Sequence, residues 1–187
     1  MLFDKGEIIR LTEEYGGAWG LNHACRLLSL ISIIDIDQQY DREAVWLAAH
    51  LHDWGAYPPF VKRDFDHALR SRQVAEQFLA DYDLDPGFVA LVLECIAFHH
   101  CADSNCSIEA ILLADADALD FLGPVGVLRD FSKNPKNLRL AYEITCRRRG
   151  TIPTQLRLEK SKEFASELLR RMDLLLSWFE ENSFGHF

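Results

Sequence analysis

The sequence has no apolar run long enough to cross a membrane and no order of residues typical of a secretory signal. Its longest apolar-looking stretch, residues 27–34, contains Ser29 and Ser32 and is far shorter than the roughly 18 residues that a membrane span needs. Residues 1–10 mix charged side chains with single apolar ones, whereas a signal peptide places its charges before an apolar core. We therefore expect a cytoplasmic protein with no membrane partner.

Paired cysteines are also missing. The five cysteines are an odd number and include no CxxC pair, which predicts free thiols in a reducing compartment and no disulfide framework. A structural zinc site of His99, His100, Cys101 and Cys106 is disfavoured, because no second cysteine pair has zinc-ribbon spacing. With 10 glycines, 6 prolines and no internal repeat in 187 residues, the composition also excludes collagen-like and low-complexity chains.

Positive charge is in short supply. Lys and Arg total 20 against 29 Asp and Glu, which gives a net charge of −9. Because such a chain repels a polyanionic backbone, we expect no polymeric nucleic acid as a partner. Hydrophobic residues make up 49% of the 187 residues, enough for one domain with a sizeable core. We expect a single domain over residues 1–187.

Apolar residues recur with helical spacing along nearly the whole chain, and alternating stretches of strand length are almost absent. This pattern predicts an all-α fold, a single compact domain of roughly seven to nine helices around a central site. Clusters of glycine, proline and asparagine mark the helix boundaries. The expected helices cover residues 2–15, 21–35, 42–53, 67–82, 87–100, 107–121, 135–149 and 155–181.

The last expected helix carries an apolar stripe among many charges. An amphipathic helix of this kind packs its apolar face on the body of the protein or on a second subunit. We expect packing on the body, with a homodimer through the stripe as the alternative. The stripe consists of Leu156, Phe164, Leu168, Leu169, Met172, Leu175 and Leu176.

Histidines gather in the first half of the chain, where six of the seven fall between residues 23 and 100. On an ideal helix His23 shares a face with Trp19 and Leu27 and should therefore point inward. A lone inward histidine is usually a core residue, whereas several histidines beside buried carboxylates indicate a site. The six are His23, His50, His52, His67, His99 and His100.

His52 is followed directly by Asp53, and we call this pair the doublet. Neighbouring positions on a helix point about 100° apart, so the doublet can serve one site only where the helix ends and the chain turns. Gly55 allows such a turn. Taken alone, the doublet would be interpreted more simply as a buried histidine and an aspartate at the end of an ordinary helix.

Asp115 and Asp117 lie in a segment, residues 108–122, that is apolar around nearly its whole circumference. They face opposite sides of the expected helix, each among apolar neighbours. A buried carboxylate needs a cation, a metal ion or strong hydrogen-bond donors, so we expect a metal ion at one of them at least. For Asp115, capping of a neighbouring helix is an equal alternative. Imidazole and carboxylate together suit several divalent ions without choosing among them.

The order His23, then His52-Asp53, then Asp117 resembles the signature of the HD superfamily of metal-dependent phosphohydrolases, which is H, then HD, then D. Residues 23–26 look like the HxxR motif of that superfamily, and residues 116–120 look like its ADxLD motif. Residues 115–129 are similar to the DADxLDxxGxxGxxR stretch of a small, stand-alone bacterial subgroup. The resemblance covers about residues 20–130, and the helices of residues 135–181 would pack on this core.

This resemblance implies a metal centre with His23, His52, Asp53 and Asp117 as ligands. Asp117 is preferred to Asp115 by the motif alone. The resemblance implies one divalent ion. Mn²⁺ is the preferred ion, with Mg²⁺, Ni²⁺, Co²⁺, Fe²⁺ or Zn²⁺ as alternatives.

Some two-metal members of the superfamily add a histidine after the doublet and a later pair of histidines. His67, His99 and His100 stand in those places. They would either hold a second ion or, as we expect, bind phosphate and act as acid and base around one ion.

The resemblance also implies the activity: hydrolysis of a phosphomonoester, phosphodiester or pyrophosphate bond in a small phosphorylated molecule, a nucleotide above all. Asp53 would steer the attacking water, and one of His67, His99 and His100 would protonate the leaving oxygen. Two alternatives stay open, a non-catalytic regulatory module that holds metal or nucleotide, and a di-iron oxygenase.

One position departs from the pattern of the superfamily. A Lys or Arg often precedes the Leu of ADxLD, and this sequence has Ala118 there. Another cation would therefore bind the phosphate, although each candidate is individually more typical of a surface or structural residue. The candidates are Arg26, Lys62, Arg63, Arg70 and Arg129.

Overall fold

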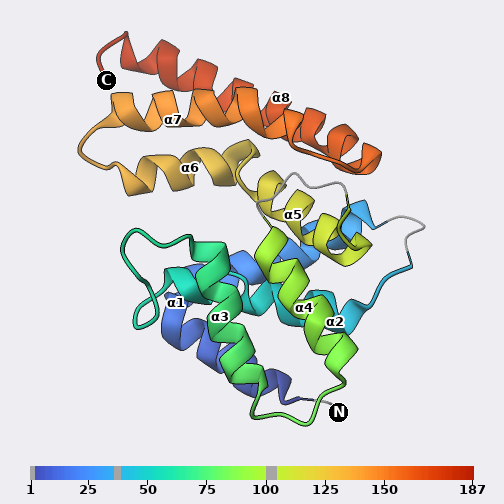
Figure 1. The fold of residues 1–187 in the computed structure, drawn as a ribbon. Helices are drawn as coiled ribbons and strands as arrows, with labels where there is room; N and C mark the ends of the chain where they lie inside the picture. Colours follow the sequence, from blue (N-terminus) through green and yellow to red (C-terminus); the bar gives the residue numbers. More distant parts are fainter. Residues whose placement is uncertain (1–2, 36–38, 100–104) are drawn as a thin grey trace. The chain divides into compact units, whose positions relative to one another are not determined.

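The computed structural model describes residues 3–35, 39–99 and 105–187. Every regular element within these ranges is a helix (Figure 1), which confirms the expected all-α fold. None of the described helices is both long and apolar enough to span a membrane. The elements are α1 (Lys5–Ile34), α2 (Arg42–Leu51), η1 (Trp54–Ala56), α3 (His67–Leu79), α4 (Pro86–Phe98), α5 (Ile108–Asp120), α6 (Gly123–Lys133), α7 (Leu138–Thr151), η2 (Ile152–Thr154) and α8 (Glu159–Ser183).

Two helices differ from the expectation. Residues 5–34 form one element with a kink at Gly17, whose φ of 66° and ψ of −174° leave helical geometry, so the two predicted helices meet there directly. The segment of α6 was not expected to be helical, because Gly123 and Pro124 read as a break. In the structure Pro124 stands in the first turn of α6, where its missing N–H costs nothing.

The chain divides into two compact units, Met1–Ala114 and Asp115–Phe187. The boundary falls inside α5, which begins in the first unit and ends in the second. The expectation of one domain over residues 1–187 stays a prediction.

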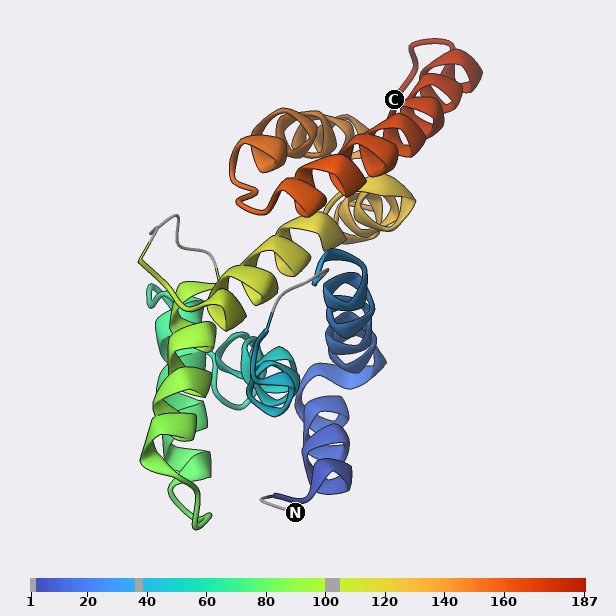
Figure 2. The same cartoon turned by 90° about the vertical axis from the view of Figure 1, so that its right-hand side faces the viewer.

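Aspartates start the helices of the first unit. The side chains of Asp4, Asp41, Asp66 and Asp85 each accept hydrogen bonds from backbone N–H groups in the first turn of α1, α2, α3 and α4, as N-caps do. Helix α2 lies between α1 and the α3–α4 pair (Figure 2) and is buried along most of its length. Its alanines at 44, 48 and 49 are fully buried, which lets the neighbouring helices approach closely.

In the second unit, α6 packs against both α7 and α8. Leu156, Met172 and Leu176 of the C-terminal stripe are buried, so part of the stripe is covered within the second unit, while packing of the C-terminal helices on the core stays a prediction. The homodimer stays a prediction. Residues 147–149 are three consecutive arginines at the end of α7. Arg148 pairs with Asp130, and Arg149 with Asp173, so two of the three have structural partners.

Candidate metal centre

The doublet lies where α2 ends. His52 is still helical, with φ −60° and ψ −28°, whereas Asp53 has φ −105° and ψ 1° and leads into η1. This turn brings two neighbouring side chains to the same site. Gly55 is needed because α3 passes so close to the turn: its N–H donates to Ser71 Oγ at 2.9 Å, and a Cβ at Gly55 would lie 2.2 Å from the Ser71 nitrogen.

Helix α1 brings His23 to the doublet. The Nε2 atoms of His23 and His52 are 3.3 Å apart, and Asp53 Oδ2 lies 3.8 Å from the first and 3.6 Å from the second. Both imidazoles are buried, while the Asp53 side chain keeps 19% of its surface exposed. The three side chains therefore form a group of ligand atoms that is buried on the imidazole side and reaches solvent at Asp53.

The orientation of His52 suits a metal ligand. Its Nδ1 lies 3.0 Å from the carbonyl oxygen of Ala49, a contact that holds the proton on Nδ1 and leaves the Nε2 lone pair facing His23. Ligand atoms about 2.1 Å from one ion lie about 3.0 to 3.4 Å apart in octahedral or tetrahedral geometry. The observed separations of 3.3 to 3.8 Å are close to this range, so the three residues fit a divalent ion after small movements.

A second group of ligand atoms shares Asp53. Its other oxygen, Oδ1, lies 3.9 Å from Nε2 of His67, and Asp53, His67 and His99 offer ligand atoms that all lie within 4.8 Å of one another. His99 Nδ1 is 2.6 Å from the carbonyl oxygen of Ile96, which directs its Nε2 lone pair away from the backbone. The His67 side chain is 40% exposed, so this side of Asp53 is open to solvent.

The structure thus brings His23, His52, Asp53, His67 and His99 together, and their individual roles stay predictions. His100 lies outside the described residues, as does Cys101 of the alternative zinc site.

His50 has no place in this group of ligand atoms although it precedes the doublet by two residues. Its Nδ1 is 2.8 Å from the carbonyl oxygen of Trp46, and its ring packs at a tilt against the Trp46 ring, with centroids 4.0 Å apart and an angle of 34° between the planes. Burial lowers the pKa of His50 below its usual value. His50 is a neutral core residue, the simpler of the two interpretations of an inward histidine.

The two aspartates of α5 differ in their surroundings within the second unit. Asp115 accepts hydrogen bonds from the backbone N–H groups of Arg157 and Leu158 at 2.9 to 3.2 Å, immediately before α8 begins. The expected alternative for Asp115, a helix cap, is therefore confirmed. Asp117 is buried, with 3% of its surface exposed, and acts electrostatically on Arg148. Its role as a fourth metal ligand stays a prediction.

The candidate phosphate-binding cations have different surroundings. Arg26 lies over the Trp19 ring at 5.6 Å, and Lys62 and Arg63 are exposed in the segment between η1 and α3. The Arg70 Nε donates to the carbonyl oxygen of Phe60 at 2.8 Å.

Arg129 differs from these four because it belongs to the second unit and is buried. Its guanidinium is 3.6 Å from Asp120 and 4.1 Å from the centroid of the Phe121 ring. These contacts give Arg129 a structural role in that unit, and phosphate binding by any of the five cations stays a prediction.

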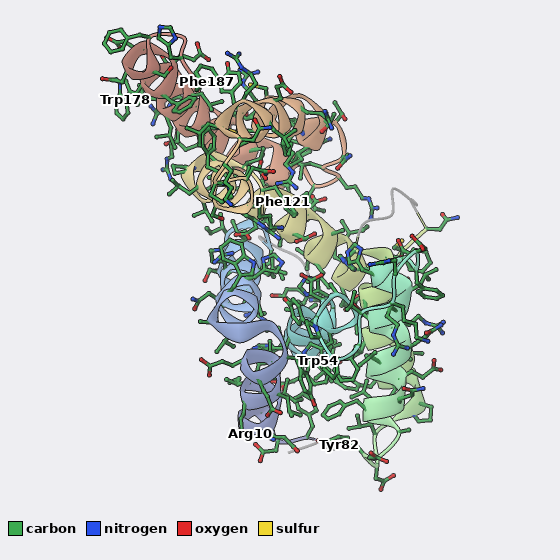
Figure 3. All side chains as sticks on the ribbon, turned by 90° about the vertical axis from the view of Figure 1, so that its left-hand side faces the viewer. Arg10, Trp54, Tyr82, Phe121, Trp178 and Phe187 are labelled. Carbon is green, nitrogen blue, oxygen red and sulfur yellow. The ribbon has the colours of Figure 1, made fainter. Side chains whose placement is uncertain are left out.

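Sequence reasoning missed the residues that hold the doublet in place. Trp54 is almost fully buried inside the first unit (Figure 3), and its indole N–H donates to Thr12 Oγ1 at 3.1 Å. Tyr15 meets Trp54 edge to face with ring centroids 5.1 Å apart. The only signal in the sequence is the density of aromatic residues after the doublet, which reads equally well as ordinary core.

Comparisons with known proteins agree with this geometry. The model of the HD domain matches residues 20–122, more than half of the chain. YpgQ from Bacillus subtilis, solved in complex with ADP, is 20% identical with a TM-score of 0.73 over 95% of this chain and 93% of its own. An HD-superfamily hydrolase from Bacillus thuringiensis is 18% identical with a TM-score of 0.72, over 95% of each chain.

A predicted HD superfamily hydrolase from an uncultured Thermotogales bacterium is 23% identical, with a TM-score of 0.67 over 95% of this chain and 90% of its own. No curated protein matches the sequence significantly. Identities this low show a shared fold, which here is that of HD-superfamily hydrolases, while the match to the domain model covers the doublet, His23 and Asp117. The chain belongs to the HD domain family.

Proposed function

We propose that the protein is a metal-dependent phosphohydrolase that acts on a small phosphorylated molecule, with a nucleotide as the preferred substrate. The observation that carries the proposal is the position of the Asp53 carboxylate, with one oxygen facing the buried imidazoles of His23 and His52 and the other facing the exposed imidazole of His67. This arrangement suits a metal-dependent hydrolase. The buried ligand atoms would hold the ion, and the solvent-exposed side of Asp53 would admit the substrate.

His23, His52 and Asp53 would hold the ion, with Asp117 as the fourth ligand implied by the sequence motif. Two imidazole nitrogens and one carboxylate oxygen suit Mn²⁺ and also Mg²⁺, Ni²⁺, Co²⁺, Fe²⁺ and Zn²⁺. When bound, such an ion polarises a phosphoryl oxygen and lowers the pKa of a water molecule towards neutrality. The buried walls of His23 and His52 keep bulk water away from this side of Asp53.

The remaining residues would move protons. Asp53 accepts a hydrogen bond from the attacking water and so orients it. His67, at the open side, would protonate the leaving oxygen, since histidine titrates near neutral pH and such a transfer contributes about 10² to 10⁴ in rate. His99 would accept a hydrogen bond at Nε2 from His67 or from the substrate, because its Nδ1 is held by the Ile96 carbonyl. His100 belongs to the same proposal by the sequence motif.

A nucleotide is the preferred substrate for two reasons. YpgQ, which shares the fold, was solved with ADP. Lys62 and Arg63 are exposed in the segment that joins the doublet to His67. Arg26 lies one turn after His23 on α1. These cations lie close in the chain to the candidate ligands and would offset the net negative charge of the protein where a phosphate binds.

The test begins with metal content. The chain, purified without chelator or affinity-tag metal, should contain about one ion per chain by mass spectrometry, and Asp53→Ala should lose it. The wild-type chain would then be incubated with phosphomonoesters, cyclic dinucleotides and nucleoside triphosphates in the presence of Mn²⁺, Mg²⁺, Co²⁺ or Ni²⁺. Release of phosphate or pyrophosphate, or opening of the cyclic dinucleotide to its linear form, that Asp53→Ala abolishes supports the proposal, and no such product with any pair of substrate and ion contradicts it.

The second group of ligand atoms favours one other candidate, an oxygenase with two iron ions. Asp53, His67 and His99 would hold the second ion, and Asp53 belongs to both groups of ligand atoms. Two iron ions per chain in protein prepared without oxygen, together with consumption of O₂, would support this candidate and contradict the phosphohydrolase.

A further inference from the structure

The middle of α1 carries a notch of two glycines, Gly16 and Gly20, that the ring of Tyr57 fills. A Cβ at Gly16 would lie 2.5 Å from Cε2 of Tyr57, and a Cβ at Gly20 would lie 2.9 Å from its hydroxyl oxygen. Because no Cβ approaches another side chain so closely, the ring packs directly on the backbone of α1. Any larger residue at these two positions would push the ring away.

The two glycines stand on opposite sides of the kink in α1. The backbone leaves helical geometry at Gly17, so the direction of the part that carries His23 is not set by an unbroken helix and must be set by packing. Gly16 precedes the kink and Gly20 follows it by three residues. Tyr57 therefore contacts both parts of α1 at once.

Tyr57 is also joined to the doublet through a short, hydrogen-bonded turn. The N–H of Ala56 donates to the carbonyl oxygen of Asp53 at 2.9 Å, and the N–H of Tyr57 donates to that of Trp54 at 3.2 Å. The next turn continues from Tyr57, whose carbonyl accepts from Phe60 N–H at 2.8 Å. These hydrogen bonds tie the backbone at Tyr57 to the backbone at Asp53, four residues earlier in the chain.

We propose that Tyr57 is a positioning residue for the metal centre, one that fixes the second part of α1, and with it His23, against the doublet. The inference rests on the proposed function. The His23 Nε2 must lie within a few tenths of an ångström of its present place to share an ion with His52 and Asp53, and the Tyr57 ring touches α1 on both sides of its kink and belongs to the turn of the doublet.

The test compares Mn²⁺ affinity in metal-stripped protein. Tyr57→Ala and Gly20→Ala should each bind Mn²⁺ about 10- to 100-fold more weakly, as expected for residues that orient metal ligands. Tyr57→Phe keeps the ring in the notch and should bind as the wild-type chain does. In the Tyr57→Ala background, Gly20→Ala should cause no further loss, because the ring with which the new methyl group clashes is gone.

Tyr82→Ala is the matched control. Tyr82 also packs against an aromatic ring of the first unit, Phe78, and its hydroxyl donates to Glu7, far along the chain from the ligands. Its truncation should lower thermal stability and leave Mn²⁺ affinity unchanged. Circular dichroism identifies variants that fail to fold, and Tyr57→Leu replaces Tyr57→Ala if the latter does not fold.

Hydrogen exchange of the metal-free chain provides a readout that does not depend on the proposed function. Tyr57→Ala should speed amide exchange in residues 15–23, and Tyr57→Phe should not. Wild-type Mn²⁺ affinity in both Tyr57→Ala and Gly20→Ala, or exchange in residues 15–23 that Tyr57→Ala leaves unchanged, would overturn the inference. A wild-type chain that binds no ion but shows the exchange difference would contradict the proposed function and leave the contact between Tyr57 and α1 supported.

Discussion

Nε2 of His23 and Nε2 of His52 face each other across 3.3 Å, although the two residues are 29 positions apart in the chain. The Nδ1 of His52 is already satisfied by the Ala49 carbonyl, so the facing nitrogen is a lone-pair donor. Two buried imidazoles with a carboxylate at 3.6 to 3.8 Å form a group that a divalent ion would stabilise by replacing weak contacts with short bonds.

The first prediction follows from this pair. His52→Ala should lose the bound ion, because one of two facing nitrogens is removed, while the helical circular dichroism signal persists. The measurement is metal content per chain after dialysis against metal-free buffer.

His50→Phe is the control for this prediction, since it changes a buried histidine two residues away and keeps a ring packed against Trp46. It should retain the ion. Equal metal content in His52→Ala and the wild-type chain would rule out the ligand assignment.

A second prediction concerns the open side of Asp53. His67→Gln should lower kcat by about 10²- to 10⁴-fold, the contribution of one proton transfer, and should leave the ion in place. Steady-state kinetics and metal content on the same preparation decide it. Loss of the ion in His67→Gln would instead show that His67 is a ligand and would favour a two-ion centre.

A third prediction separates the two aspartates of α5. Asp115→Ala removes the acceptor for the N–H groups of Arg157 and Leu158 and should lower the free energy of unfolding by about 1 to 2 kcal/mol, as the loss of a helix cap does. It should keep the ion. Asp117→Ala should lose the ion or bind it more weakly.

Chemical denaturation and metal analysis of both variants test this assignment. If Asp115→Ala lost the ion and Asp117→Ala kept it, the alignment of the ADxLD motif would be wrong by two residues.

A fourth prediction concerns the thiols. Burial raises the pKa of the Cys95 thiol far above its usual value, so this thiol should stay protonated and unreactive in the folded chain. Cys25 is exposed on α1 and should react readily. Mass spectrometry after a short treatment with iodoacetamide, with and without denaturant, should show Cys25 modified in both samples and Cys95 modified only in the denatured one.

The helical fold and the site were predictable from the sequence to different degrees. Helical spacing indicated most helices, and the doublet at a helix end was inferred from Gly55. The role of that glycine was not predictable, because it depends on the approach of Ser71 from α3. Similarly, α6 begins at a glycine and a proline that read locally as a break, although a proline in the first turn also suits a helix start, and the packing of α6 against α7 and α8 favours a helix there.

Within the site, periodicity placed His23 inward but could not say which histidine it would meet. His50 and His52 both belong to the end of α2, and both are buried. Their different surroundings arise from the 200° or so between positions two residues apart on a helix, which sends His50 to Trp46 and His52 to His23. Which of the two directions faces α1 is a property of tertiary packing.

The four aspartates at the helix starts affect the electric field that a phosphate ligand would meet. Each of the carboxylates of Asp4, Asp41, Asp66 and Asp85 is bonded to backbone N–H groups, and each lies at the partially positive end of a helix, which offsets part of its field. The field close to each of these four carboxylates is therefore weaker than a full charge would give, while the net charge of −9 still repels an anion at long range. Association of a nucleotide with this chain should accordingly become faster as added salt screens this repulsion, with short-range attraction at the doublet controlling capture.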